Sequence, residues 1–112
     1  IKIAVVTSSQ NCTSVLRAAG VHDLFDARVD GNVIAEQGLA GKPAPDAFLK
    51  AARMLGVTPE RAVVIEDAVS GVQAGARGRF GLVVGVDRHN NAAQLTDHGA
   101  QIVVRDLVEL LY

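Results

Sequence analysis

The sequence is poor in aromatic residues, in cysteine and in excess charge. Only 4% of its 112 residues are aromatic, which argues against the exposed stacking platform of proteins that bind single-stranded nucleic acid. Cys12 is the single cysteine, so no internal disulfide can form, and a lone thiol fits a reducing compartment. The net charge is -1, from 11 basic and 12 acidic residues. Nothing in this balance indicates binding to nucleic acid or to an anionic membrane surface.

The sequence also has no long apolar run. No stretch approaches the roughly 20 apolar residues that span a bilayer, and no secretory leader pattern is visible. We therefore expect a cytoplasmic protein with neither a membrane nor a nucleic-acid partner. The chain starts at Ile1, directly inside a strand-like run, and we interpret it as truncated or processed.

Aliphatic residues are abundant and recur in two alternating patterns. Hydrophobic residues make up 49% of the chain, enough for the core of one domain. Short apolar runs, typical of buried strands, alternate with helical patterns, which indicates βαβ crossovers and a mainly parallel sheet. We predict a Rossmann-like α/β fold with three α/β/α layers. The predicted strands are 2–6, 25–29, 62–65, 81–86 and 102–104, and the predicted helices are 11–19, 45–55, 70–76, 90–98 and 107–112.

Three shorter features complete this prediction. Residues 30–32, Asp-Gly-Asn, indicate a turn, and 58–60 a single turn of helix with proline at its first position. The helix at 70–76 is expected to pack closely through Gly71, Ala74 and Gly75. In such folds ligands bind beyond the carboxyl ends of the strands, which directs attention to residues 7–9, 66–67 and 87–88.

Glu66 and Asp67 are adjacent carboxylates that directly follow a buried strand. Two such charges about 4 Å apart repel by roughly 4 kcal/mol at an effective dielectric near 20. A cation would remove that cost, and carboxylate oxygens completed by water suit Mg²⁺. The ordinary alternative is that Asp67 caps the next helix while Glu66 is solvated. Asp87 and Arg88 could line the same site or simply form a salt bridge in a turn.

Two further clusters are suited to binding an anion. Thr7, Ser8 and Ser9 offer hydroxyls and backbone N–H groups between a strand and a helix, and Asn11 could add a donor. Their ordinary alternative is a helix cap. Lys42 lies between Gly41 and a proline, where its ammonium could neutralise phosphate oxygens, although most loop lysines are simply exposed. The ordinary explanations do not predict all these clusters in this order.

These motifs resemble those of the haloacid dehalogenase-like (HAD) phosphatases and phosphomutases, in the β-phosphoglucomutase-like branch. Residues 3–9 resemble the second motif, 41–46 the third and 64–75 the fourth. The resemblance covers essentially the whole chain.

The resemblance also implies roles for individual residues. It implies that Thr7 and the Ser8 N–H bind the transferring phosphoryl group and that Lys42 stabilises it. It further implies that Asp67, with Glu66, helps to hold Mg²⁺.

The family's first motif, Asp-x-Asp-x-Thr/Val, does not occur in this sequence. That motif supplies an aspartate nucleophile and an acid/base aspartate, and the helical cap that follows it in this branch is also absent. We therefore interpret residues 1–112 as the C-terminal part of a HAD-like core domain. In the family the missing strand lies between those equivalent to 2–6 and 62–65. Either the missing segment is present elsewhere, or these strands pair directly, or another chain fills the gap.

The expected parent protein is a Mg²⁺-dependent phosphatase or phosphomutase that acts on a small sugar phosphate through an aspartyl-phosphate. The 112 residues alone are expected to be inactive. The alternative is a non-catalytic HAD-derived module that binds phosphate or a partner. A receiver domain is disfavoured, because its acidic pair follows the first strand, where this sequence has residues 7–9.

Overall fold

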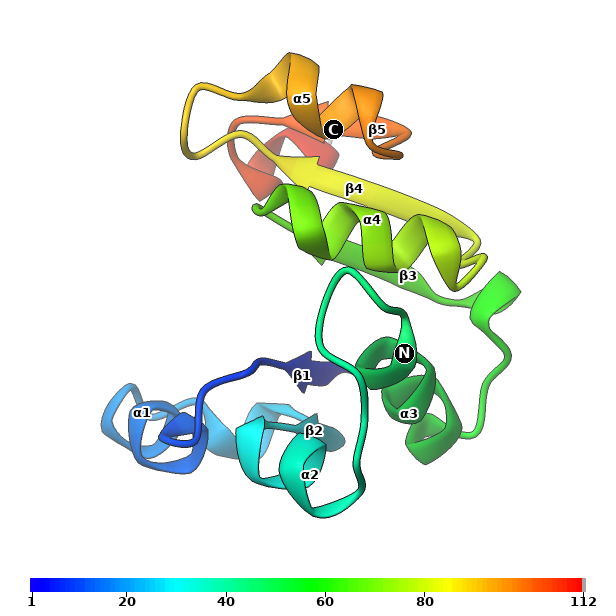
Figure 1. The fold of residues 1–112 in the computed structure, drawn as a ribbon. Helices are drawn as coiled ribbons and strands as arrows, with labels where there is room; N and C mark the ends of the chain where they lie inside the picture. Colours follow the sequence, from blue (N-terminus) through cyan, green and yellow to red (C-terminus); the bar gives the residue numbers. More distant parts are fainter. Residues whose placement is uncertain (112) are drawn as a thin grey trace.

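The structure is a computed structural model that describes residues 1–111. Strands and helices alternate along the chain (Figure 1), as the sequence predicts. The strands are β1 (Ala4–Val6), β2 (Ala27–Val29), β3 (Val63–Glu66), β4 (Leu82–Val86) and β5 (Ile102–Val104). The α-helices are α1 (Cys12–Ala18), α2 (Gly31–Glu36), α3 (Asp46–Leu55), α4 (Val69–Arg77) and α5 (Ala92–Asp97). Short 3₁₀ turns are η1 (His22–Leu24), η2 (Pro59–Arg61) and η3 (Leu107–Leu111).

All strand pairs are parallel, but they form two sheets. β1 pairs with β2, and β3, β4 and β5 form the second sheet in that order. Figure 1 shows the two sheets apart, joined through α3. The parallel α/β class is thus confirmed. Of the three arrangements considered for the strands at 2–6 and 62–65, direct pairing is wrong within residues 1–111, because β1 and β3 are not hydrogen-bonded to each other.

The core is aliphatic and lies where helices cover the sheets. The larger cluster centres on Val64, Val72, Val83 and Leu95, with Phe48 at its margin. A second cluster joins Val29 to α3 through Ala47 and Ala51. One face of β3 stays open, since Val63 and Ile65 are 56% and 51% exposed. The Val63 and Ile65 side chains thus form a hydrophobic surface that the rest of residues 1–111 leaves uncovered.

One predicted turn is wrong. Residues 30–32 begin helix α2 rather than a reversal of the chain. Buried Asp30 caps the helix, since its Oδ1 accepts a hydrogen bond of 3.0 Å from the Val33 N–H, and Arg28 Nε lies 3.3 Å from the other carboxylate oxygen. Aspartate favours helix caps as well as turns, so Asp-Gly-Asn was ambiguous.

Other boundaries differ by a few residues or in helix type. The predicted last helix is the 3₁₀ turn η3, and its final residue, Tyr112, lies outside the described residues. Gly20 and Gly56 follow helices with φ of 73° and 72°, the left-handed conformation that favours glycine. None of the helices in residues 1–111 has the length and apolar character to cross a membrane.

Candidate functional site

Lys42 and Glu66 form an ion pair in the described structure. Lys42 Nζ donates a hydrogen bond of 2.9 Å to Glu66 Oε2, across 24 positions of sequence. The side chains are 24% and 13% exposed, so neither is the solvated surface charge of the ordinary explanations. The ammonium also lies 5.0 Å from the centre of the Phe48 ring, a favourable cation–π distance. The loop at 41–45 thereby reaches the end of β3.

The Glu66 carboxylate also contacts the start of helix α4. Its Oε1 accepts hydrogen bonds from the Asp67 and Ala68 N–H groups, at 3.2 and 3.3 Å. Free N–H groups at a helix start carry partial positive charge, which favours a carboxylate there. The cap position itself is Ala68, with no side-chain cap bond. The alternative in which Asp67 caps α4 is therefore wrong.

Asp67 is more accessible to a ligand than Glu66 is. Its side chain is 42% exposed, and its Oδ2 lies 3.6 Å from His89 Nε2. The sequence offered no signal for this neighbour, because His89 has no ligand spacing to another histidine or to Cys12. Only the ends of β3 and β4, which pair in parallel, bring Asp67 and His89 together.

The Thr7–Ser9 cluster forms a compact turn after β1. The Thr7 N–H extends the strand by donating to the Val29 carbonyl at 2.9 Å. Thr7 Oγ1 accepts from the Ser9 N–H at 3.2 Å, and Ser9 Oγ accepts from the Asn11 N–H at 3.1 Å. The helix-cap alternative holds in part, because Ser9 satisfies an N–H at the start of α1, whose cap residue Asn11 makes no side-chain cap bond.

A cavity of about 270 Å³ opens between β1 and β3 at the carboxyl ends of the strands. Its lining residues are Val6, Ile65, Glu66, Asp67, Val86, Arg88 and Leu107. Val6 directly precedes Thr7 in the chain, but Thr7, Ser8, Ser9 and Asn11 are not among the lining residues. Lys42 is not a lining residue either, although it contacts Glu66, which is one. Of the three sequence clusters, only the acidic pair lines the cavity directly.

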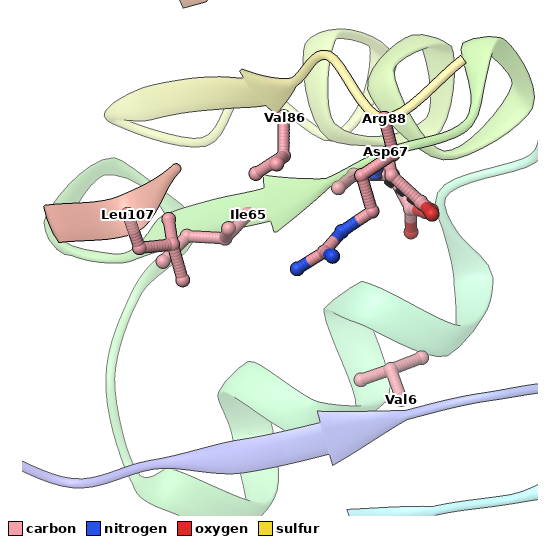
Figure 2. Close-up of a pocket in the computed structure, with 7 residues that line it drawn as sticks. Val6, Ile65, Asp67, Val86, Arg88 and Leu107 are labelled. Carbon is pink, nitrogen blue, oxygen red and sulfur yellow. Dashed lines mark hydrogen bonds between the residues drawn. The ribbon is translucent and has the colours of Figure 1, made fainter. Parts of the chain in front are cut away.

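Arg88 extends its side chain into this cavity. Figure 2 shows its guanidinium group between the ends of β3 and β1, above Val6 and near Asp67. Among residues 1–111 Arg88 forms no ion pair. Its neighbour Asp87 instead accepts a hydrogen bond of 2.8 Å from the Asn91 N–H. The alternative of a salt bridge between Asp87 and Arg88 is therefore wrong, and Arg88 lines the site.

The acidic pair fits a partial magnesium site. Within the described residues no three side chains of histidine, cysteine, aspartate or glutamate gather at one point. Mg²⁺ commonly takes one or two protein carboxylates, with water and substrate phosphate completing its shell. Asp67 has free oxygen lone pairs, and Glu66 Oε2 accepts only the Lys42 hydrogen bond. These donors match that pattern but supply only part of a full set.

Several known proteins are similar to this chain in sequence and fold. A model of haloacid dehalogenase-like hydrolases matches residues 1–79. β-Phosphoglucomutase of Mycobacterium bovis is 54% identical over 97% of the chain, which covers 43% of that relative. A HAD family hydrolase structure from Deinococcus radiodurans, with bound phosphate and sodium, has a TM-score of 0.81 and 35% identity over 96% of this chain and 48% of its own. The β-phosphoglucomutase structure from Clostridium difficile has a TM-score of 0.81 and 32% identity over 98% of this chain and 45% of its own.

The chain belongs to the haloacid dehalogenase-like hydrolase family. Within that family its relatives include β-phosphoglucomutases, as the resemblance implied. The chain spans less than half the length of each of these three proteins.

Proposed function

We propose that the protein transfers the phosphoryl group of a small sugar phosphate with the help of Mg²⁺, and that this chain contributes the phosphate-binding and metal-binding half of the site. The observation that carries this proposal is the Lys42–Glu66 ion pair of 2.9 Å beside Asp67, at a cavity bordered by β1 and β3. The identity of 54% to a β-phosphoglucomutase supports a hexose phosphate as the substrate.

The chain's own residues have distinct tasks in this proposal. Thr7 and the Ser8 N–H bind the phosphoryl oxygens, with Ser9 and Asn11 at the margin of the phosphate site. Lys42 leaves or shares its contact with Glu66 to neutralise the charge that develops on the phosphoryl group, which is the main requirement of phosphoryl transfer.

The metal side of the site belongs to the acidic pair. Asp67 and the remaining lone pair of Glu66 Oε2 would hold Mg²⁺, which when bound would supply charge neutralisation at the phosphoryl oxygens. Arg88 adds a second cation at the rim of the cavity, where a planar guanidinium group can bind phosphate in a bidentate manner.

The nucleophile comes from a strand outside these 112 residues. Within residues 1–111, β1 and β3 each have one edge without a strand partner, and both strands border the cavity. Exposed edges of apolar strands are prone to pair with another strand. One parallel strand between them would lie about 5 Å from each. Its carboxyl end would then meet Thr7, Lys42 and Asp67. An aspartate there would attack phosphorus and form an aspartyl-phosphate, and a second would protonate the leaving oxygen.

This strand comes from an N-terminal segment of the same protein or from another chain. In either case residues 1–112 form the C-terminal part of the core domain, and alone they have no turnover. Hydrolysis of the aspartyl-phosphate would make the protein a phosphatase. Return of the phosphoryl group to another hydroxyl would make it a mutase.

The test compares the 112 residues alone with a longer protein that contains a preceding Asp-x-Asp segment. Phosphate release and isomerisation are measured with a panel of hexose phosphates, with and without Mg²⁺. We expect turnover only from the longer protein with Mg²⁺, and a loss of about 100-fold or more on Asp67→Ala, because metal stabilisation amounts to several kcal/mol. Asp97→Ala, at the end of α5, is the matched control. Robust turnover by the 112 residues alone would contradict the proposal, and phosphate binding without turnover by the longer protein would favour a non-catalytic module.

A further inference from the structure

Gly71 lies inside helix α4, where its position is not explained by its backbone. It is buried, and its φ is not among the positive values found at Gly20, Gly38, Gly56 and Gly99. Alanine would therefore be conformationally acceptable there, and glycine destabilises a helix interior relative to alanine. A reason other than backbone conformation must account for glycine at this position.

The reason is the space that Glu66 occupies. A methyl group built on Gly71 would overlap Cγ, Cδ and Oε2 of the Glu66 side chain. The overlapped atoms are those that carry the contacts of the site, since Oε2 accepts from Lys42 and the same carboxylate accepts from the Asp67 and Ala68 N–H groups. Any side chain at 71 would have to displace the Glu66 carboxylate or move α4 away from β3.

Gly75, which lies in the same helix, has a different role. A methyl group on Gly75 would meet the side chains of Val64 and Val83 at 3.1 to 3.3 Å, so Gly75 allows α4 to pack closely on the sheet. The expectation that α4 packs closely through both glycines is confirmed, but the two contact different parts of β3. Gly71 faces the charged end of β3, and Gly75 faces its apolar middle.

We infer that Gly71 is a positioning residue of the candidate site. Because Gly71 has no side chain, the Glu66 carboxylate can lie against the start of α4. Through Glu66, Gly71 also positions the Lys42 ammonium. This positioning does not depend on a metal. Its consequence for Mg²⁺ and phosphate binding rests on the proposed function.

The test uses Gly71→Ala, Glu66→Ala and the double variant in the longest form of the protein that carries this chain. Gly41→Ala is the matched control, because a methyl group there meets nothing within 4 Å although the residue adjoins Lys42. The first readout is the amide NMR resonances of Asp67 and Ala68 without metal. The second is the Mg²⁺ dissociation constant by calorimetry.

We expect Gly71→Ala to shift both amide resonances as Glu66→Ala does. We also expect it to raise the Mg²⁺ dissociation constant about 10- to 100-fold, the usual effect of disturbing groups that orient a metal ligand. In the Glu66→Ala background the same change should add less than about twofold, because contacting residues are coupled in a double-mutant cycle. Gly41→Ala should leave both readouts unchanged.

Folding provides a further check. If Gly71→Ala does not fold, adding Glu66→Ala should restore folding, since it removes the overlapping atoms. Failure to restore it, unmoved amides of Asp67 and Ala68, or an additive loss in the Glu66→Ala background would each overturn the inference. If the unaltered protein binds no Mg²⁺ while the amides respond as expected, the proposed function fails and the positioning role of Gly71 stands.

Discussion

The Lys42–Glu66 ion pair should be worth a measurable free energy of unfolding, even without ligand. At 2.9 Å and an effective dielectric of 20, two opposite unit charges attract by about 6 kcal/mol. Desolvation of both groups offsets most of this energy. Partial exposure, 24% for Lys42 and 13% for Glu66, weakens the attraction further through solvent screening. We therefore expect a net coupling of about 1–2 kcal/mol, toward the lower end of the roughly 1.5–3 kcal/mol found for hydrogen bonds to charged groups.

A double-mutant cycle with Lys42→Met and Glu66→Gln isolates this coupling. Methionine keeps most of the length and apolar volume of lysine over the Phe48 ring, and glutamine can still accept from the Asp67 and Ala68 N–H groups. Urea unfolding of the four proteins is followed by circular dichroism, and the midpoints give the free energies of unfolding. A coupling of this size would lower the melting temperature of either single variant by roughly 4–8 °C.

The control for this cycle is Lys50→Met on helix α3. Lys50 forms no ion pair among residues 1–111, so its replacement should change stability by less than about 0.5 kcal/mol. A coupling energy below about 0.3 kcal/mol would refute the reasoning. It would mean that in solution Lys42 and Glu66 do not hold each other, and that the lysine is already free to meet a phosphate.

Three other perturbations have clear expected outcomes. Arg88→Ala should raise KM for a phosphate ester several-fold more than it lowers kcat in the active longer protein, because Arg88 borders the cavity and has no ion partner among residues 1–111. Equal losses in both would argue for a role in the chemical step. Asp30→Ala should destabilise the protein by about 1–2 kcal/mol in urea unfolding through loss of the α2 cap and the Arg28 contact. In Gly31→Ala the added methyl group would overlap the Ser8 carbonyl oxygen. The variant should therefore bind inorganic phosphate about tenfold more weakly by calorimetry, with an unchanged circular dichroism spectrum. Undiminished binding would show that the turn at Thr7–Ser9 is not part of the phosphate site.

Much of the fold could be predicted because its signals are local. The strands at the centre of the second sheet are short runs of valine, isoleucine and leucine, and such runs have few other stable environments. Helix α3 has apolar residues on one face and ends at a glycine with positive φ, as its sequence suggests. Helix α2 was missed because Asp30, Gly31 and Asn32 suit a turn as well as a helix start. Whether these residues form a turn or begin a helix depends on burial against residues distant in sequence.

The residues of the candidate site could be predicted from the sequence, but the contacts between them could not. The order of Thr7, Lys42, Glu66 and Asp67 indicated phosphate and metal chemistry, and the family match agrees with that order. Sequence reasoning treated Lys42 as a phosphate ligand and Glu66 as a metal ligand. It offered no sign that the two would bind each other, because their contact spans 24 positions and depends on how the loop at 41–45 lies over the end of β3.

The parallel α/β class and the family follow from the sequence alone, because apolar periodicity and short polar motifs are properties of neighbouring residues. The tertiary structure was needed to show that β1 and β3 do not pair with each other within residues 1–111 and lie on either side of a cavity, since strand pairing depends on which edges meet in space. The tertiary structure also decided that Gly71 makes room for Glu66, because two residues five positions apart come into contact only where a helix folds back on the strand before it.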